Sequence, residues 1–212
     1  MNMANVILTS DDFGMSNIYN TEMLAAISAG WLSSISVMVE RNIARQEKQV
    51  SALLELYSKK HLSLGLHLEI SSEKKVYAQC VSQWKKFLEI TGKTPDYIDI
   101  HKDHLFRSTF DFVAAFCKEK NVGFRKYMET NVLVRSPQET LNASYLELDQ
   151  VLGRLSKLES GEVIEIVFHI GSHDAAITSA LNRERENDMA KLESVFNEVT
   201  NKGINLVNYK MI

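Results

Sequence analysis

The chain has 212 residues, of which 45% are hydrophobic, so it can bury one sizeable core, and we predict a single domain over residues 1–212. Its 24 Lys and Arg residues nearly balance its 27 Asp and Glu residues, which gives a formal net charge of -3. This balance excludes the strong positive field with which proteins bind nucleic acid or anionic membranes, and it favours a small or neutral substrate.

The N-terminus and the cysteines bear on the cellular location. The sequence MNMANVILTSDD has no charged leader followed by a long apolar stretch, and no segment approaches 18 uninterrupted apolar residues. Cys80 and Cys117 lack CxxC spacing and lie in segments with helical periodicity, which is typical of buried thiols in a reducing compartment. We therefore expect a soluble cytoplasmic protein.

Short apolar runs alternate along the chain with longer segments in which apolar residues recur every three or four positions. In chain order, this pattern predicts strand 5–9, helix 16–29, strand 32–39, helix 43–60, strand 62–70, helix 80–91, strand 97–101, helix 108–120, strand 122–127, helix 137–158, strand 163–170, helix 183–201 and strand 204–209. Ser136-Pro137-Gln138-Glu139 has the composition of a capped helix start. The charged run 182–191 is interpreted as the solvated face of a helix.

Alternating strands and helices indicate an α/β fold with parallel strands joined by crossover helices. We predict an incomplete or distorted (β/α) barrel of about seven strands with outer helices, because the complete eightfold barrel usually needs roughly 250 residues. An open doubly wound sheet is the alternative. Both folds place functional residues at the carboxyl ends of the strands.

Acidic and imidazole side chains follow several of these predicted strands. Asp11 and Asp12 end the first strand, and five histidines lie at later strand ends, namely His67, His101, His104, His169 and His173. One such histidine alone would more often be a hydrogen-bonded core residue, but four strands that supply His or Asp to the same end predict a shared site. Two histidines and a carboxylate can hold a divalent cation with positions left for water and substrate. A cation held by one aspartate would offset the repulsion within the pair and leave its neighbour free as a base.

Three further acids each lie on the same strand face as one of these histidines. Asp99, Glu69 and Glu165 either point into the barrel and orient the histidines, or are solvated acids at the loop edges. The sequence has no GxGxxG or GxxxxGK[ST] phosphate loop and no GxSxG elbow. Metal chemistry at the strand ends is therefore the hypothesis that the motifs favour.

Four stretches in this order, TSDDFGMS, LGLHLEI, DYIDIHKDHLF and FHIGSHD, resemble the YdjC-like carbohydrate deacetylases, the family that includes chitooligosaccharide deacetylase. The resemblance runs from about residue 5 to residue 209. It implies an incomplete barrel and a divalent metal, Mg²⁺ or Zn²⁺, held by Asp12, His67 and His101. It also implies that Asp11 is the general base and His169 the general acid, and that Arg125 lies in the cleft, where it positions Asp11 or the substrate or forms a structural salt bridge.

The implied reaction is the hydrolysis of an N-acetyl group on an amino sugar or short oligosaccharide, with a homodimer compatible with the family. Two alternatives remain open. One is a dinuclear metal phosphoesterase in which His104 and His173 hold a second ion. The other is a non-catalytic sugar-binding relative, because the third stretch departs from the family pattern and the segment between His67 and His101 is short for the family.

Overall fold

The structure is a computed structural model that describes residues 3–125 and 127–212. Its centre is a sheet of eight strands, all of whose pairings are parallel. The strands are β1 Asn5–Phe13, β2 Ser34–Val37, β3 Ser63–Leu68, β4 Tyr97–Ile100, β5 Gly123–Phe124, β6 Glu139–Asn142, β7 Val163–Phe168 and β8 Asn205–Leu206. Their spatial order is β5-β4-β3-β2-β1-β7-β6, with β8 paired to the start of β1.

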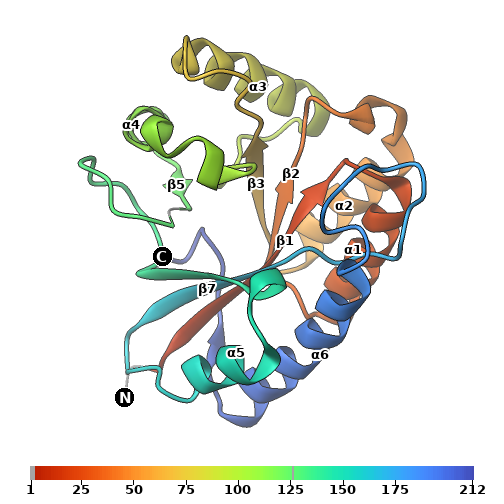
Figure 1. Cartoon of the computed structure of the whole chain (residues 1–212), viewed down its shortest axis with the longest axis vertical. Helices are drawn as coiled ribbons and strands as arrows, with labels where there is room; N and C mark the ends of the chain where they lie inside the picture. Colours follow the sequence, from red (N-terminus) through yellow and green to blue (C-terminus); the bar gives the residue numbers. More distant parts are fainter. Residues whose placement is uncertain (1–2, 126) are drawn as a thin grey trace.

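Helices surround the outside of this sheet, which curls into a half-barrel with β5 and β6 at its two edges (Figure 1). The α-helices are α1 Asn17–Ala29, α2 Glu47–Lys59, α3 Val76–Thr91, α4 Phe110–Lys120, α5 Leu148–Leu155 and α6 Arg185–Asn201. Single 3₁₀ turns include η2 Asp103–Leu105 and η4 Ala143–Tyr145. The predicted α/β fold, an incomplete (β/α) barrel of about seven strands with outer helices, is confirmed.

Aromatic rings fill the interior of the half-barrel below the carboxyl ends of the strands. Tyr97 stacks on Tyr209 with ring centroids 3.8 Å apart, and both side chains are fully buried. Gly65 lies opposite Tyr97 in the sheet register, and a β-carbon at Gly65 would fall on the tyrosine ring. The Tyr209 hydroxyl donates a hydrogen bond to Glu165 Oε2 at 2.5 Å, so the C-terminal segment closes the floor of the barrel.

Most predicted elements are present, but the segment 137–158 differs from the prediction. Glu139–Asn142 pairs with β7 as the edge strand β6, and the helix begins only at Leu148. The capping box belongs to Glu147 and Gln150, so the helix start predicted at Ser136-Pro137 is wrong. Of the predicted strand 122–127, only Gly123–Phe124 is a strand, and Lys126 lies outside the described residues.

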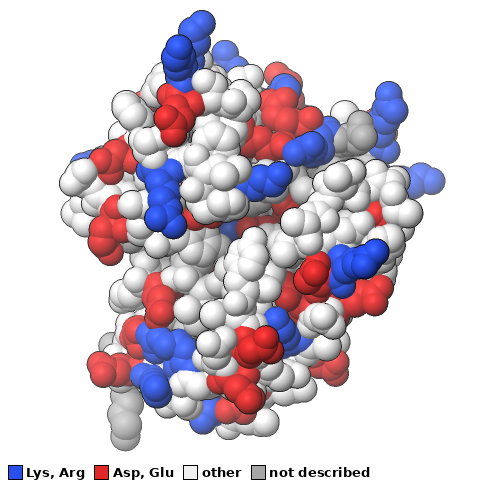
Figure 2. All heavy atoms as spheres, in the orientation of Figure 1, with Lys and Arg blue, Asp and Glu red and all other residues white. Residues whose placement is uncertain are grey.

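Two simpler expectations can be compared with the structure. Both cysteines are free and buried, as predicted, and burial raises the pKa of the Cys80 thiol to about 12. Within residues 3–125 and 127–212, no helix has the length and apolar character needed to cross a membrane. Lys and Arg side chains are interspersed with Asp and Glu over the face in Figure 2, which agrees with the balanced composition.

Candidate metal and catalytic site

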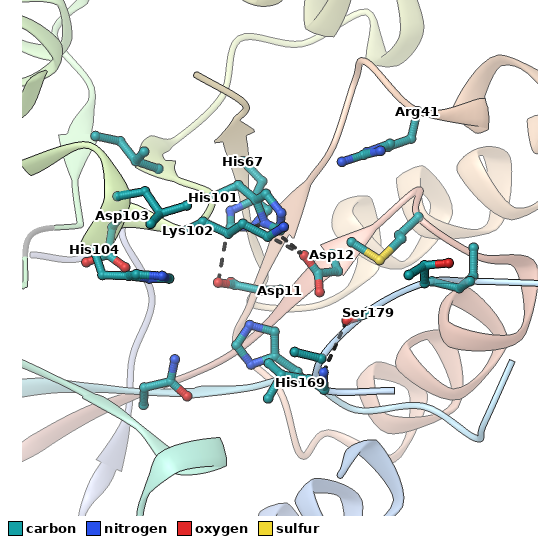
Figure 3. Close-up of a pocket in the computed structure, with 18 of the residues that line it drawn as sticks. Asp11, Asp12, Arg41, His67, His101, Lys102, Asp103, His104, His169 and Ser179 are labelled. Atoms are coloured by element: carbon teal, nitrogen blue, oxygen red, sulfur yellow. Dashed lines mark hydrogen bonds and ion pairs between the residues drawn. The ribbon is translucent and has the colours of Figure 1, made fainter. Parts of the chain in front are cut away.

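The carboxyl end of β1 is irregular, and this irregularity aims two adjacent aspartates at one place. The pairing of β1 with β2 shifts register between Ser10 and Phe13, and Asp12 has a φ of 72°, in the left-handed region. Neighbouring residues of a regular strand point to opposite faces, whereas a bulge can redirect a side chain. Both carboxylates therefore reach the same cleft, as Figure 3 shows, at the cost of a backbone conformation that Asp tolerates better than most residues.

Asp12, His67 and His101 converge at the carboxyl ends of β1, β3 and β4. Asp12 Oδ1 lies 3.3 Å from His67 Nε2 and 3.5 Å from His101 Nδ1, and the two ring nitrogens are 3.0 Å apart. Ligand atoms held about 2.0–2.2 Å from one ion lie about 3.0–3.5 Å from one another. Asp12 Oδ1 is also buried and has no hydrogen-bond partner. The three side chains therefore fit a divalent cation.

Two of these ligands are oriented by buried neighbours. Arg185 Nη2 donates to Asp12 Oδ2 at 2.5 Å, which leaves Oδ1 facing the histidines. Asp99 Oδ2 pairs with His67 Nδ1, which leaves Nε2 on the side of Asp12. Such contacts fix which atom of a side chain is offered to a metal.

Charge within this cluster shifts the pKa values of both ligands. Burial would raise the pKa of Asp12, but the neighbouring rings of His101 and His67 and the charge of Arg185 hold it well below its usual value. Burial disfavours the charged form of His67, yet the carboxylates of Asp99 and Asp11 raise its pKa well above the usual value of an imidazole. In the metal-free protein, a proton therefore occupies the position that a cation would take.

Asp11 lies beside the ligands but has a different set of contacts. Arg125 Nη1 donates to Asp11 Oδ2 at 2.7 Å, while Asp11 Oδ1 is buried without a hydrogen-bond partner. The same nitrogen donates to Asp99 Oδ2 at 2.9 Å, so a guanidinium already fills the space among Asp11, His67 and Asp99, a second group with metal-ligating spacing. Arg125 is only 2% exposed, and it contacts Asp11 from beneath the cleft.

His169 follows β7 and lies across the aspartate pair from His67 and His101 (Figure 3). Its ring lines the cleft and is almost fully buried. Burial lowers the pKa of His169, and the carboxylates of Asp12 and Asp11 partly oppose that effect. The imidazole is thus placed to exchange a proton with a group bound next to Asp11 and Asp12.

A cleft of about 810 Å³ lies over these side chains. Its lining includes the loop of small and apolar residues 176–181 and the side chains of Tyr127, Asn142 and Tyr145. Arg41, Lys102 and His104 lie around its rim. A volume of this size accommodates a small molecule or a short oligosaccharide.

The three acids that share strand faces with the histidines differ in burial and in their partners. Asp99 orients His67, as expected of an internal acid. Glu165 is internal but bonds Arg125, Thr9 and Tyr209. Glu69 is half-buried and pairs with Arg41, so it neither orients a histidine nor is fully solvated.

His104 and His173 bear on the dinuclear alternative. His104 lines the cleft and His173 is exposed. Across the part of the chain that the structure describes, neither belongs to a group of metal-ligating side chains. The structure therefore offers no support for a second ion.

Two buried residues of the site come from the charged run 182–191. The interpretation of this run as a solvated face holds for residues 183, 184, 186 and 187, which are exposed, but is wrong for Arg185 and Asp188. Arg185 is 0% exposed and Asp188 1%. Arg185 lies over the ring of Tyr19, 3.9 Å from its centroid, and bonds Asp12. Both residues continue the buried stripe of α6, which recurs every three or four positions at Leu192, Val195 and Val199. Extending that stripe backwards along the sequence would have found them.

Comparisons with known proteins give the sequences that this chain resembles. The family model of the YdjC-like proteins matches residues 5–80. A carbohydrate deacetylase from Clostridium beijerinckii is 25% identical over 249 aligned positions, which cover 98% of this chain and 99% of the relative. A chitooligosaccharide deacetylase from Escherichia fergusonii is 22% identical over 57% of this chain and 58% of its own length.

Solved structures share the fold at lower identity. A protein from Enterococcus faecalis V583, provisionally named for cellobiose-phosphate cleavage, superposes with a TM-score of 0.81 at 18% identity and covers 99% of this chain and 98% of its own. A family 4 acetyl xylan esterase from Clostridium thermocellum with bound cobalt gives a TM-score of 0.57 at 13% identity, with 98% and 89% covered. By its sequence matches, the chain is similar to the YdjC-like proteins and to carbohydrate deacetylases.

Proposed function

We propose that the protein is a metal-dependent hydrolase that removes an N-acetyl group from an amino sugar or short oligosaccharide. The observation that carries the proposal is the convergence of Asp12, His67 and His101 on one point at the floor of the cleft, with Asp11 and His169 beside it. The names of the curated relatives support the carbohydrate amide as the substrate class.

Each residue of the site has one part in the proposed reaction. A divalent cation held by Asp12, His67 and His101 would polarise the acetyl carbonyl and lower the pKa of a water molecule. Asp11 takes the proton of the attacking water on its free Oδ1, while Arg125 holds the other oxygen in place. His169 donates a proton to the nitrogen as the C–N bond breaks, because an unprotonated amine is a poor leaving group. Acetate and the free amino sugar are the products.

The finer assignments belong to the same proposal. Mg²⁺ or Zn²⁺ is the proposed ion. A carboxylate and two imidazoles are common ligands of Zn²⁺, and an open site with bound water also suits Mg²⁺. The proposed substrate is small enough for the cleft. We also propose that the protein is cytoplasmic and that it forms a homodimer, which is compatible with the resemblance to the family. The curated relative from Clostridium beijerinckii aligns over 249 positions, more than the 212 residues here, so it has segments that this chain lacks.

The proposal is tested by measuring acetate release from N-acetylglucosamine oligomers, with and without a chelator. We expect release that stops on chelation and returns when a divalent cation is added back. Binding of the oligomers, measured by calorimetry, without any release of acetate would contradict the proposal and would support the non-catalytic sugar-binding relative instead.

A further inference from the structure

His169 is connected through a serine to a buried carboxylate that the proposed reaction does not use. The Nδ1 atom of His169 lies 2.9 Å from Ser144 Oγ, and Ser144 Oγ donates to Asp188 Oδ2 at 2.5 Å. The backbone amide of His169 donates to the same carboxylate oxygen at 2.8 Å. Three elements far apart in the chain, η4, α6 and the end of β7, thus meet at one imidazole.

The direction of these hydrogen bonds determines which nitrogen of His169 carries a proton. An ionised carboxylate can only accept, so the hydroxyl proton of Ser144 goes to Asp188. Ser144 Oγ must then accept from His169, and this requires a proton on Nδ1. The neutral ring is left with an unprotonated Nε2, which Ser144 does not contact, in a residue that lines the cleft.

The surrounding contacts hold this arrangement in place. Lys191, one turn along α6 from Asp188, donates to the carbonyl oxygens of Ala143 and Leu146, both at 2.8 Å. These bonds fix η4, and therefore Ser144, against α6. The Lys191 ammonium is 3.9 Å from Asp188 Oδ1, so the buried carboxylate has a positive neighbour.

We propose that Ser144 and Asp188 are positioning residues that hold His169 as the Nδ1–H tautomer, so that Nε2 is the atom that carries the transferable proton in the cleft. The inference rests on the proposed function for its catalytic consequence, but the tautomer itself does not depend on turnover. When Nε2 is protonated, the ring becomes an imidazolium whose charge faces Asp188 through Ser144. The hydrogen-bond chain therefore leaves Nε2 as the ring nitrogen that can take up and release a proton.

The test compares the full chain with Ser144→Ala, and with Ser144→Thr as the conservative variant. Ser194→Ala is the matched control, because Ser194 is a half-buried serine of the same helix whose hydroxyl donates to the carbonyl of Ala190, within its own helix. The first readout is the ¹⁵N NMR spectrum of the histidine rings, with the His169 signals identified by their loss in His169→Gln. We expect Nδ1 protonated and Nε2 unprotonated in the neutral ring of the wild type and of Ser144→Thr, and a mixture of tautomers in Ser144→Ala.

The second readout is steady-state deacetylation. Ser144→Ala should lower kcat about 10–100-fold with little change in KM, and Ser144→Thr should recover most of that loss. A wild-type ring protonated on Nε2, or a Ser144→Ala protein with unchanged tautomer and unchanged kcat, would overturn the inference. If acetate release were absent altogether while the tautomer still depended on Ser144, the positioning role of Ser144 and Asp188 would be supported and the proposed function would be contradicted.

Discussion

Asp11 and Asp12 are adjacent in the chain, but each has one oxygen held and one oxygen free. Arg185 holds Oδ2 of Asp12 and Arg125 holds Oδ2 of Asp11, while the Oδ1 atom of each is buried without a hydrogen-bond partner. A buried oxygen without a partner loses about 1–3 kcal/mol of hydration, so each free oxygen indicates a ligand. The Oδ1 atom of Asp12 faces two imidazoles and suits a cation, and the free Oδ1 of Asp11 supports the proposal that Asp11 is the base.

The role of Asp11 is tested by Asp11→Asn. The amide oxygen can still accept from Arg125, so the fold and the metal should be retained, but the amide cannot take a proton from water. We expect kcat to fall about 10²–10⁴-fold, the usual contribution of a general base. Rate measurements at saturating metal check this, with metal content of the purified variant as the control. A variant that turns over at the wild-type rate would show that Asp11 is not the base.

At the scale of the elements, the strands that bring these residues together were predictable because they are buried on both faces. Parallel strands covered by helices consist of nearly continuous runs of apolar residues, and β3 and β7 are of this kind. Their carboxyl ends meet at one edge, so the positions of His67 and His169 followed from the strand limits alone.

One element and the burial of part of another could not be predicted in the same way. The strand β6 has the sequence ETLN and is half-exposed at a sheet edge, so it lacks an apolar pattern and only its pairing with β7 makes it a strand. The helix α6 was expected, but the burial of its charged first turn was not, because charged residues are normally exposed. The buried stripe of α6 extends to Arg185 and Asp188, and Asp12 and the backbone amide of His169 supply their partners.

The packing of β3 against β4 gives a prediction at this scale. Gly65→Ala places a methyl group on the Tyr97 ring, which is itself held by its stack on Tyr209. Overpacking of this kind costs about 1–3 kcal/mol, and we expect urea unfolding to show a loss of stability in that range. Gly153→Ala is the control, since a β-carbon there meets nothing within 4 Å and alanine in a helix is favoured over glycine by up to about 1 kcal/mol. Equal stability of the two variants would contradict the packing described here.

At the scale of the molecule, the half-barrel concentrates negative charge at one end. Four buried carboxylates, those of Asp11, Asp12, Asp99 and Glu165, face two buried guanidinium groups, those of Arg125 and Arg185. The tyrosines of the barrel floor separate this cluster from solvent below, so the cleft is its route to water. A divalent cation would offset the excess of negative charge, and without it His67 holds a proton.

The competition between proton and metal has a defined sign. Only the neutral imidazole of His67 binds a cation, and its pKa in the metal-free protein lies well above the usual 6.5. Metal affinity should therefore be full only above that raised pKa and should weaken steadily as the pH falls through and below it, with a proton released on binding.

Isothermal titration of the metal-free chain with Zn²⁺ or Mg²⁺ at several pH values tests the central claim, that Asp12, His67 and His101 form one cation site. We predict one ion per chain, an affinity that rises with pH, no binding at this site in Asp12→Ala, and unchanged binding in His173→Ala, whose histidine is exposed outside the donor group. Wild-type binding of two ions per chain, or an Asp12→Ala protein that binds as the wild type does, would contradict the account.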